Sequence, residues 1–175
     1  RKYYNGCEFM NWFYKLIALI ITLFIHFPVG EMESYSASYD DASLVFTVLS
    51  DVHIEGNNED RFARFGEGLA DINSAKRNDA LIFLGDNTMN GQVIETLFSY
   101  GLVNRFIGSN NVIVAPGNHD MDTSDNTNGT FETLQKRYIT MRNAFFGNSG
   151  NKVYYSREEK GYKFIVLGGE GRTAE

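Results

Sequence analysis

The chain has 175 residues, 43% of them hydrophobic and 22% charged, with a formal net charge of −6. This length fits one domain with a sizeable core, and the acidic balance disfavours a nucleic-acid surface, which needs a basic patch. The single cysteine, Cys7, rules out a disulfide framework within the chain.

The first predicted element is an apolar segment, Leu16–Phe27, which follows Lys15 and precedes a polar stretch. A positive residue, a short apolar core and small polar residues are the layout of a secretory signal, with Met10 as the favoured start of translation. The core is shorter than the roughly 20 residues of a membrane span, so a retained anchor is the alternative. We therefore expect an extracytoplasmic protein, secreted or periplasmic, whose N-terminal segment contacts the membrane transiently.

The chain divides into three parts by composition. Residues 1–30 are upstream residues plus the signal peptide or anchor, residues 31–43 form a polar linker, and residues 44–175 form the domain. Without residues 1–30, the chain keeps 13 basic and 21 acidic residues, a net charge of −8. An acidic domain can still bind phosphate esters when bound cations reverse the local field.

Three apolar runs in this domain predict buried parallel strands, at residues 44–49, 80–84 and 111–115. Helical periodicity predicts helices at residues 59–75, over a pattern from Val93 to Ile107, and at residues 130–146. Two further apolar runs, at residues 152–156 and 162–167, predict a hairpin with a five-residue connection. The fold class is therefore α/β, with the order β-α-β-α-β followed by a helix and a hairpin.

A polar motif follows each predicted parallel strand. The three motifs are Asp51-Val52-His53, Gly85-Asp86-Asn87 and Gly117-Asn118-His119-Asp120. Each one alone reads as a helix cap, a turn or a core histidine. Because the carboxyl ends of parallel strands meet at one edge of a sheet, where ligands bind, three motifs in this order favour a metal site. Mixed carboxylate and imidazole ligands suit iron, manganese or zinc better than calcium or magnesium.

The motifs resemble the first three sequence blocks of the calcineurin-like metallophosphoesterases, D-x-H, G-D and G-N-H-D/E, over about Leu44–Leu167. The later histidine blocks of that family, G-H and G-H-x-H, have no counterpart, because the three histidines are His26, His53 and His119. The resemblance therefore implies a layered α/β sandwich of which this chain is the N-terminal half, incomplete at its C-terminus. On this interpretation the fragment alone is inactive.

The resemblance also implies a cofactor and a ligand set. The cofactor would be two divalent or mixed-valence ions, with manganese, iron or zinc favoured. Asp51, His53, Asp86 and Asn118 would be the metal ligands, and Asp86 would bridge the two ions. The implied reaction is hydrolysis of a phosphate mono- or diester by attack of a metal-bridging hydroxide.

The remaining site residues follow from the same resemblance. His119 would act as the acid, and Asp120 would orient it and favour its protonated form. Asn118, His119 and Asn87 would contact the substrate. The stretch Gly85–Gly91 is similar to the G-D-x-T-x-x-G of cyclic-nucleotide-phosphodiesterase-like members, so the expected substrate is a small phosphate ester or nucleotide-like molecule. The alternative is a truncated, non-catalytic member that serves as a metal- or ligand-binding module.

Overall fold

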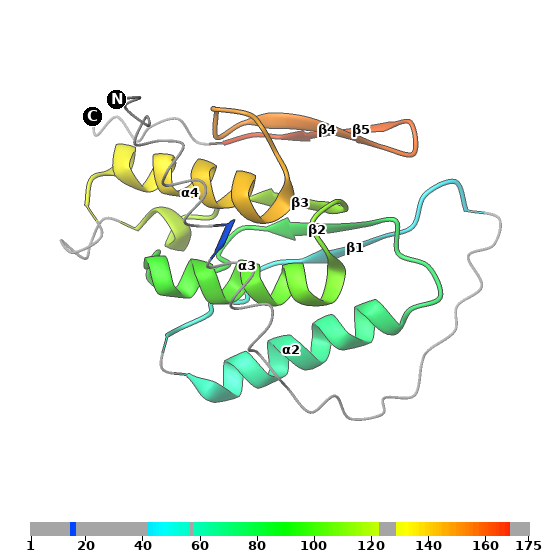
Figure 1. Ribbon diagram of the computed structural model, residues 1–175, viewed down its shortest axis with the longest axis horizontal. Coiled ribbons are helices and arrows are strands. Elements are labelled where there is room, and N and C mark those ends of the chain that lie inside the picture. The colour runs from blue at the N-terminus through cyan, green and yellow to red at the C-terminus, as the bar shows by residue number, and fades with distance from the viewer. Residues whose placement is uncertain (1–14, 17–41, 57, 123–128, 169–175) are drawn as a thin grey trace, which may run out of the picture.

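The computed structural model describes residues 15–16, 42–56, 58–122 and 129–168 (Figure 1). The expected export segment and the linker lie almost entirely outside these residues. Among the helices of the described part, none is long and apolar enough to cross a membrane.

A parallel three-stranded sheet forms the centre of the domain. Its strands β1 (Phe46–Leu49), β2 (Ala80–Leu84) and β3 (Val112–Ala115) lie in the order β1-β2-β3. In register, Val48 of β1 lies opposite Ile82 of β2, which lies opposite Ile113 of β3. The predicted parallel strands and the α/β class are thus confirmed.

Three helices cover one face of this sheet: α2 (Glu59–Ser74), α3 (Val93–Ile107) and α4 (Phe131–Phe146) (Figure 1). Side chains cap two of them, since Asn58 accepts a hydrogen bond from the backbone N of Arg61 and Thr130 accepts one from that of Thr133. The buried core between sheet and helices includes Leu81, Phe83, Val112, Val114, Phe65, Leu69, Leu97, Tyr100, Tyr138 and Phe145. This packing fixes the sheet edge from which the motifs project.

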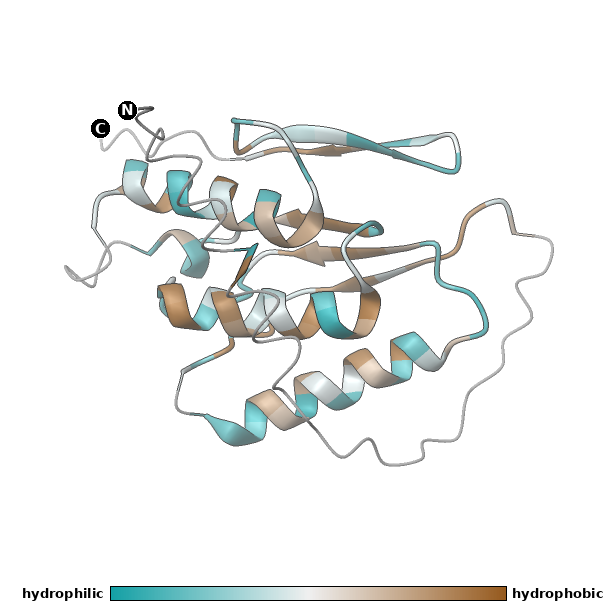
Figure 2. Ribbon diagram, in the orientation of Figure 1, coloured by the Kyte–Doolittle hydropathy of each residue, from teal (hydrophilic) through white to brown (hydrophobic). Residues whose placement is uncertain are grey.

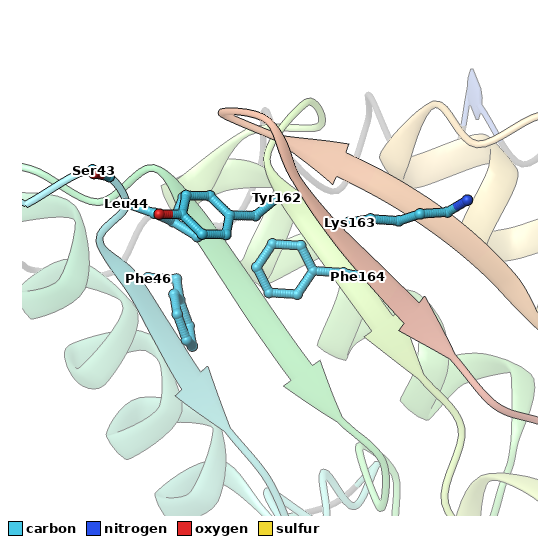
Figure 3. A pocket seen from close by; sticks show the side chains of 6 residues that line it. All are labelled: Ser43, Leu44, Phe46, Tyr162, Lys163 and Phe164. Atoms are coloured by element: carbon cyan, nitrogen blue, oxygen red, sulfur yellow. The ribbon is translucent and has the colours of Figure 1, made fainter.

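The opposite face of the sheet is partly open. Phe46, Val48 and Leu84, which alternate with the core residues, are 45%, 47% and 48% exposed. Figure 2 shows hydrophobic residues concentrated in β2 and β3, whereas the hairpin turn is hydrophilic. Phe164 of the hairpin meets Phe46 edge to face, with ring centroids 5.8 Å apart. A shallow pocket of about 430 Å³ lies here, lined by Ser43, Leu44, Phe46, Tyr162, Lys163 and Phe164 (Figure 3).

The hairpin bounds predicted from sequence are wrong. The strands are β4 (Tyr155–Glu159) and β5 (Tyr162–Val166), so the connection is two residues long and the first strand starts three residues later than predicted. Lys160 and Gly161 both have positive φ, of 53° and 81°, as a type I′ turn requires. The charged run Arg157–Glu159, whose composition is typical of a loop, belongs to the strand because it pairs with Tyr162–Phe164 of β5, and Arg157 pairs with Glu159 at 2.6 Å within it.

Side chains close the outer edge of β3. The hydroxyl of Tyr155 lies 2.9 Å from both the backbone N and the carbonyl O of Val114, and the hydroxyl of Tyr138 donates to that carbonyl at 2.7 Å. Arg157 donates to the carbonyl of Val112 at 3.1 Å. Unpaired strand groups are a template for aggregation, so these side chains protect the edge.

Candidate metal centre

The first two motifs are joined by backbone hydrogen bonds that continue beyond β1 and β2. The backbone N of Asp51 donates to the carbonyl of Gly85 at 3.2 Å, and that of His53 donates to the carbonyl of Asp86 at 2.9 Å. The N of Ile54 then donates to the carbonyl of Asn87 at 3.1 Å. The two motifs therefore run side by side where the strands end.

Three of the predicted ligands have an unusual backbone. Asp51, His53 and Asp86 have φ of 56°, 48° and 48°, in the left-handed region that side-chain-bearing residues seldom occupy. Each such residue costs about 1–3 kcal/mol and persists where the surroundings determine it, frequently at functional sites. In the described residues the fourth non-glycine case, Lys160, lies in the hairpin turn. The clustering of the other three marks the strand ends as a functional site.

His53, Asp86 and His119 converge on one point. Each offers one ligand atom, and these atoms all lie within 4.8 Å of one another. The two imidazole rings meet edge to face with centroids 4.6 Å apart. Asp51 lies beside this group: its Oδ1 is 4.0 Å from Nε2 of His53, and its side chain is 66% exposed. Two imidazoles and a carboxylate at this spacing are a credible ligand set for a metal ion.

Close backbone approach brings the second and third motifs together. The backbone N of His119 donates to Oδ1 of Asp86 at 3.0 Å. Any Cβ on Gly117 would overlap Oδ1 and the backbone N of Asp86, and one on Gly85 would lie 2.8 Å from the backbone of Gly117. The two glycines are thus required for the carboxylate of Asp86 to sit against the third motif.

The ring of His119 is oriented by a carbonyl. Its Nδ1 lies 2.7 Å from the carbonyl O of Met89. Because a carbonyl only accepts hydrogen bonds, Nδ1 carries the proton and Nε2 of the neutral ring is the atom available to a ligand. In His53, by contrast, Nδ1 is buried and has no hydrogen-bond partner among the described residues.

Asp120, predicted to orient His119, has its carboxylate hydrogen-bonded to other groups in the structure. Its carboxylate accepts hydrogen bonds from Gly117 N at 2.8 Å, Thr88 N at 2.9 Å, Thr88 Oγ1 at 2.8 Å, and the N and Nδ2 of Asn87, both at 3.3 Å. Asp120 therefore joins the loop after β2 to the loop after β3. Burial raises the pKa of its carboxyl, against the opposing effect of these hydrogen bonds.

Asn87, predicted as a substrate contact, is buried in the structure. Asn87 is 0% exposed, and its Nδ2 donates to the carbonyl of Ala115 at 3.2 Å as well as to Asp120. It therefore faces the protein interior. Asn118 is exposed and precedes the short 3-10 helix η1 (His119–Met121), without a capping hydrogen bond from its side chain. Its position leaves the amide free of any role in helix capping.

Two contributors to the site were missed in the sequence. The backbone carbonyl of Met89 could not be recognised in the sequence, because every residue has a backbone carbonyl. Glu95 does have one: Gln92 and Glu95 have the spacing of a capping box at the start of α3. The capping-box spacing indicates only a helix terminus, whereas Glu95 also accepts hydrogen bonds from Asn90, next to Met89.

Comparison with known proteins adds a family to this geometry. Residues 44–173 match the sequence model described as "Calcineurin-like phosphoesterase". The chain belongs to this family. Neither the curated proteins nor the solved structures gave a match. Membership indicates metal-dependent phosphoester hydrolysis, and the expected α/β fold and family resemblance are both confirmed.

The residues present fit the divalent metal that the family implies. The cluster of His53, Asp86 and His119 combines nitrogen and oxygen ligands, which suits zinc, iron or manganese. The buried, unpartnered Nδ1 of His53 is also an atom whose bonding capacity the described residues leave unused. The carbonyl of Met89 also holds the ring of His119 in one orientation beside these groups.

Proposed function

We propose that this protein hydrolyses small phosphate mono- or diesters, nucleotide-like ones included, with two divalent or mixed-valence metal ions. The observation that supports this most is the convergence of His53, Asp86 and His119 at the strand ends. The match to the calcineurin-like phosphoesterase family gives the reaction class. The similarity of Gly85–Gly91 to cyclic-nucleotide-phosphodiesterase-like members favours the substrate class.

The ligands are divided between two ions in this proposal. Asp51, His53 and Asp86 hold one ion, and Asp86 and Asn118 hold the second, so that Asp86 is shared. Such ions, when bound, polarise a phosphoryl oxygen and supply a nucleophile at neutral pH. Manganese, iron or zinc suits these ligands.

His119 acts on the leaving group in the proposed reaction. Its Nδ1–H is held by the Met89 carbonyl, so the proton it exchanges is the one on Nε2. A protonated Nε2 can donate to the leaving oxygen of the ester, and the ring is held in one orientation while it does so. Asp120 contributes by fixing the loops that carry Asp86 and His119, not by touching the ring.

Removal of Asp86 tests the proposal. The full chain is loaded with manganese, its metal content is measured, and hydrolysis of bis(4-nitrophenyl) phosphate and 4-nitrophenyl phosphate is followed. Asp86→Ala should lose both paired metal binding and turnover. Asp71→Ala, which removes an exposed carboxylate from α2, is the matched control and should change neither. Retention of two ions per chain by Asp86→Ala would overturn the bridging role.

A second candidate function is metal or ligand binding without catalysis. The observation that favours it is the small ligand set: the chain has three histidines, and the cluster uses two of them. The same assay separates the two functions. Metal binding at the cluster without hydrolysis of either ester would favour the binding module.

We propose in addition that the protein acts outside the cytoplasm. Lys15 followed by the apolar segment Leu16–Phe27 supports export, with transient membrane contact through that segment. Expression of residues 10–43 fused to a reporter enzyme that works only after export would test this. A reporter that remains inactive with this segment, but works with a known signal, would contradict it.

A further inference from the structure

The loop of residues 88–92, called here the site loop, lies between β2 and α3 and hydrogen-bonds to the ring of His119 through one atom. That atom is the carbonyl O of Met89, 2.7 Å from Nδ1 of His119. The position of this carbonyl decides which ring nitrogen carries the proton, and therefore which one faces the metal site. Whatever fixes the site loop also fixes the chemistry of His119.

The site loop is held from α3 by the carboxylate of Glu95, which is 1% exposed. Its Oε2 accepts hydrogen bonds from the backbone N of Asn90 at 2.9 Å and of Gln92 at 3.2 Å, and its Oε1 accepts one from Nδ2 of Asn90 at 2.9 Å. Hydrogen bonds to an ionised acceptor are about twice as strong as neutral ones. Asn90, which directly follows Met89, is therefore held by two hydrogen bonds to Glu95.

These contacts go beyond what a helix terminus needs. A capping box uses the bond from Glu95 to the backbone N of Gln92. The two bonds to Asn90 lie outside the helix and act on the site loop itself. Gly91 allows the loop to lie close to the third motif, because a Cβ at this position would lie 3.0 Å from the carbonyl oxygens of both His119 and Asp120.

Other contacts hold the loop on its remaining sides. Arg61 donates to the carbonyl of His53 at 2.8 Å, and the same nitrogen lies 3.7 Å from Sδ of Met89. Arg137 of α4 donates to the carbonyl of Gly91 at 2.8 Å. Glu95 differs from these two cations because it binds the backbone immediately beside the Met89 carbonyl.

We propose that Glu95 is a positioning residue of this site. Through Asn90 it holds the Met89 carbonyl against His119, keeps the proton on Nδ1 and leaves Nε2 for the reaction. The catalytic part of this inference rests on the proposed function, whereas the effect on the ring does not.

Nitrogen NMR of the metal-free full chain, labelled at histidine, reads the ring directly. The chain has three histidines, and a His119→Gln sample identifies the signal of His119. In the parent protein, we expect the neutral ring to be the Nδ1–H tautomer. In Glu95→Gln, an amide NH2 replaces one of the two oxygens that accept hydrogen bonds from Asn90 and Gln92. The Met89 carbonyl should then no longer be held against Nδ1, and His119 should shift to a mixture of tautomers.

Two further variants separate positioning from helix capping. Asn90→Ala removes one bond to Glu95 and leaves the Gln92 bond, so it should disturb His119 without loosening α3. Thr130→Ala removes the cap of α4 and is the control: it should lower stability but leave the tautomer unchanged. In turnover, Glu95→Gln should reduce kcat about 10-fold or more, with a smaller change in KM.

The outcomes are distinct. If the folded variants Glu95→Gln and Asn90→Ala kept the His119 tautomer of the parent protein, the inference would be overturned and Glu95 would be only a helix cap. A tautomer shift in a protein whose parent hydrolyses neither phosphate ester would support the positioning role while the proposed function fails. A shift together with the loss of kcat supports both.

Discussion

Each end of the parallel sheet is tied together by an aspartate, and the two aspartates are in opposite electrostatic settings. At the amino ends, Asp79 pairs with Arg77 at 2.6 Å and with Lys160 at 3.7 Å, while it binds the backbone N of Val45. At the carboxyl ends, Asp120 accepts all five of its hydrogen bonds from the uncharged residues Asn87, Thr88 and Gly117.

The pKa shifts follow this difference. The hydrogen bond from Arg77 holds the pKa of Asp79 below its usual value, whereas burial raises the pKa of Asp120. The amino end is thus neutralised by the chain's own cations. At the carboxyl end, the carboxylate of Asp86 lies close to His53 and His119, and that of Asp51 lies 4.0 Å from His53, so that end favours a bound cation. The difference separates a structural end of the sheet from a functional one.

The largest expected effect is at the carboxyl end, from Gly117→Ala. Its Cβ would overlap Asp86, whose backbone has no room to move because Gly85 and Gly117 are in contact. We expect a loss of at least about 3 kcal/mol in the free energy of unfolding, together with loss of manganese binding. Urea unfolding and a manganese titration measure the two effects.

The control for this substitution is Gly68→Ala in α2. A Cβ on Gly68 would meet nothing within 4 Å, so alanine should stabilise the helix by about 0.5–1 kcal/mol. If Gly117→Ala were as stable as the parent and bound manganese equally well, the close approach of the two motifs would not matter to the site.

A smaller effect is expected from Asp120→Asn. Whichever oxygen becomes an amide nitrogen, at least one backbone N–H then faces another donor, at a cost of about 1–3 kcal/mol. Because Asp120 joins the loops carrying Asp86 and His119, metal affinity should also fall about 10- to 100-fold. Calorimetric titration with manganese measures this fall, with Asp71→Asn as the control. An unchanged affinity in Asp120→Asn would confine Asp120 to the stability of the fold.

The smallest effect is expected at the amino end, from Asp79→Asn, and it should depend on pH. Because the folded-state pKa of Asp79 is lowered, its stabilisation is complete above the unfolded value of about 3.9 and is lost as pH falls through the folded value. Asp79→Asn should therefore cost up to about 1 kcal/mol at pH 7. The difference from the parent should shrink in acid.

Urea unfolding at a series of pH values checks this dependence. Glu132→Gln is the control, because its pair with Lys136 at 2.8 Å is exposed and should contribute no measurable stability. Metal binding should be unchanged in Asp79→Asn. A loss of metal affinity there would show that the two ends of the sheet are not independent.

The sequence predicted well the parts that depend on local pattern. The apolar run at Ala80–Leu84 predicted β2, and the periodicity that ends at Ile107 predicted α3, because burial determines the pattern of apolar residues in each element. It misplaced the end of β4, because the run Arg157–Glu159 has the charged composition typical of a turn but pairs with β5 as part of the strand.

The strand-end motifs located the site but not the role of every residue in it. Asp51, His53, Asp86 and His119 were expected together, and the structure places them together. The interior roles of Asn87 and Asp120 could not be predicted, because most of their partners lie about 30 residues away in the chain. A motif gives the residue types, whereas their direction depends on long-range packing.

A crystal structure of the full chain grown with zinc, with anomalous data collected at the zinc edge, tests the metal centre most directly. We predict an anomalous peak about 2.0–2.2 Å from ligand atoms of His53 and Asp86. His119 should either join this coordination through Nε2 or lie beside it. An ordered zinc peak elsewhere on the protein, with none at these residues, would contradict the metal centre described here.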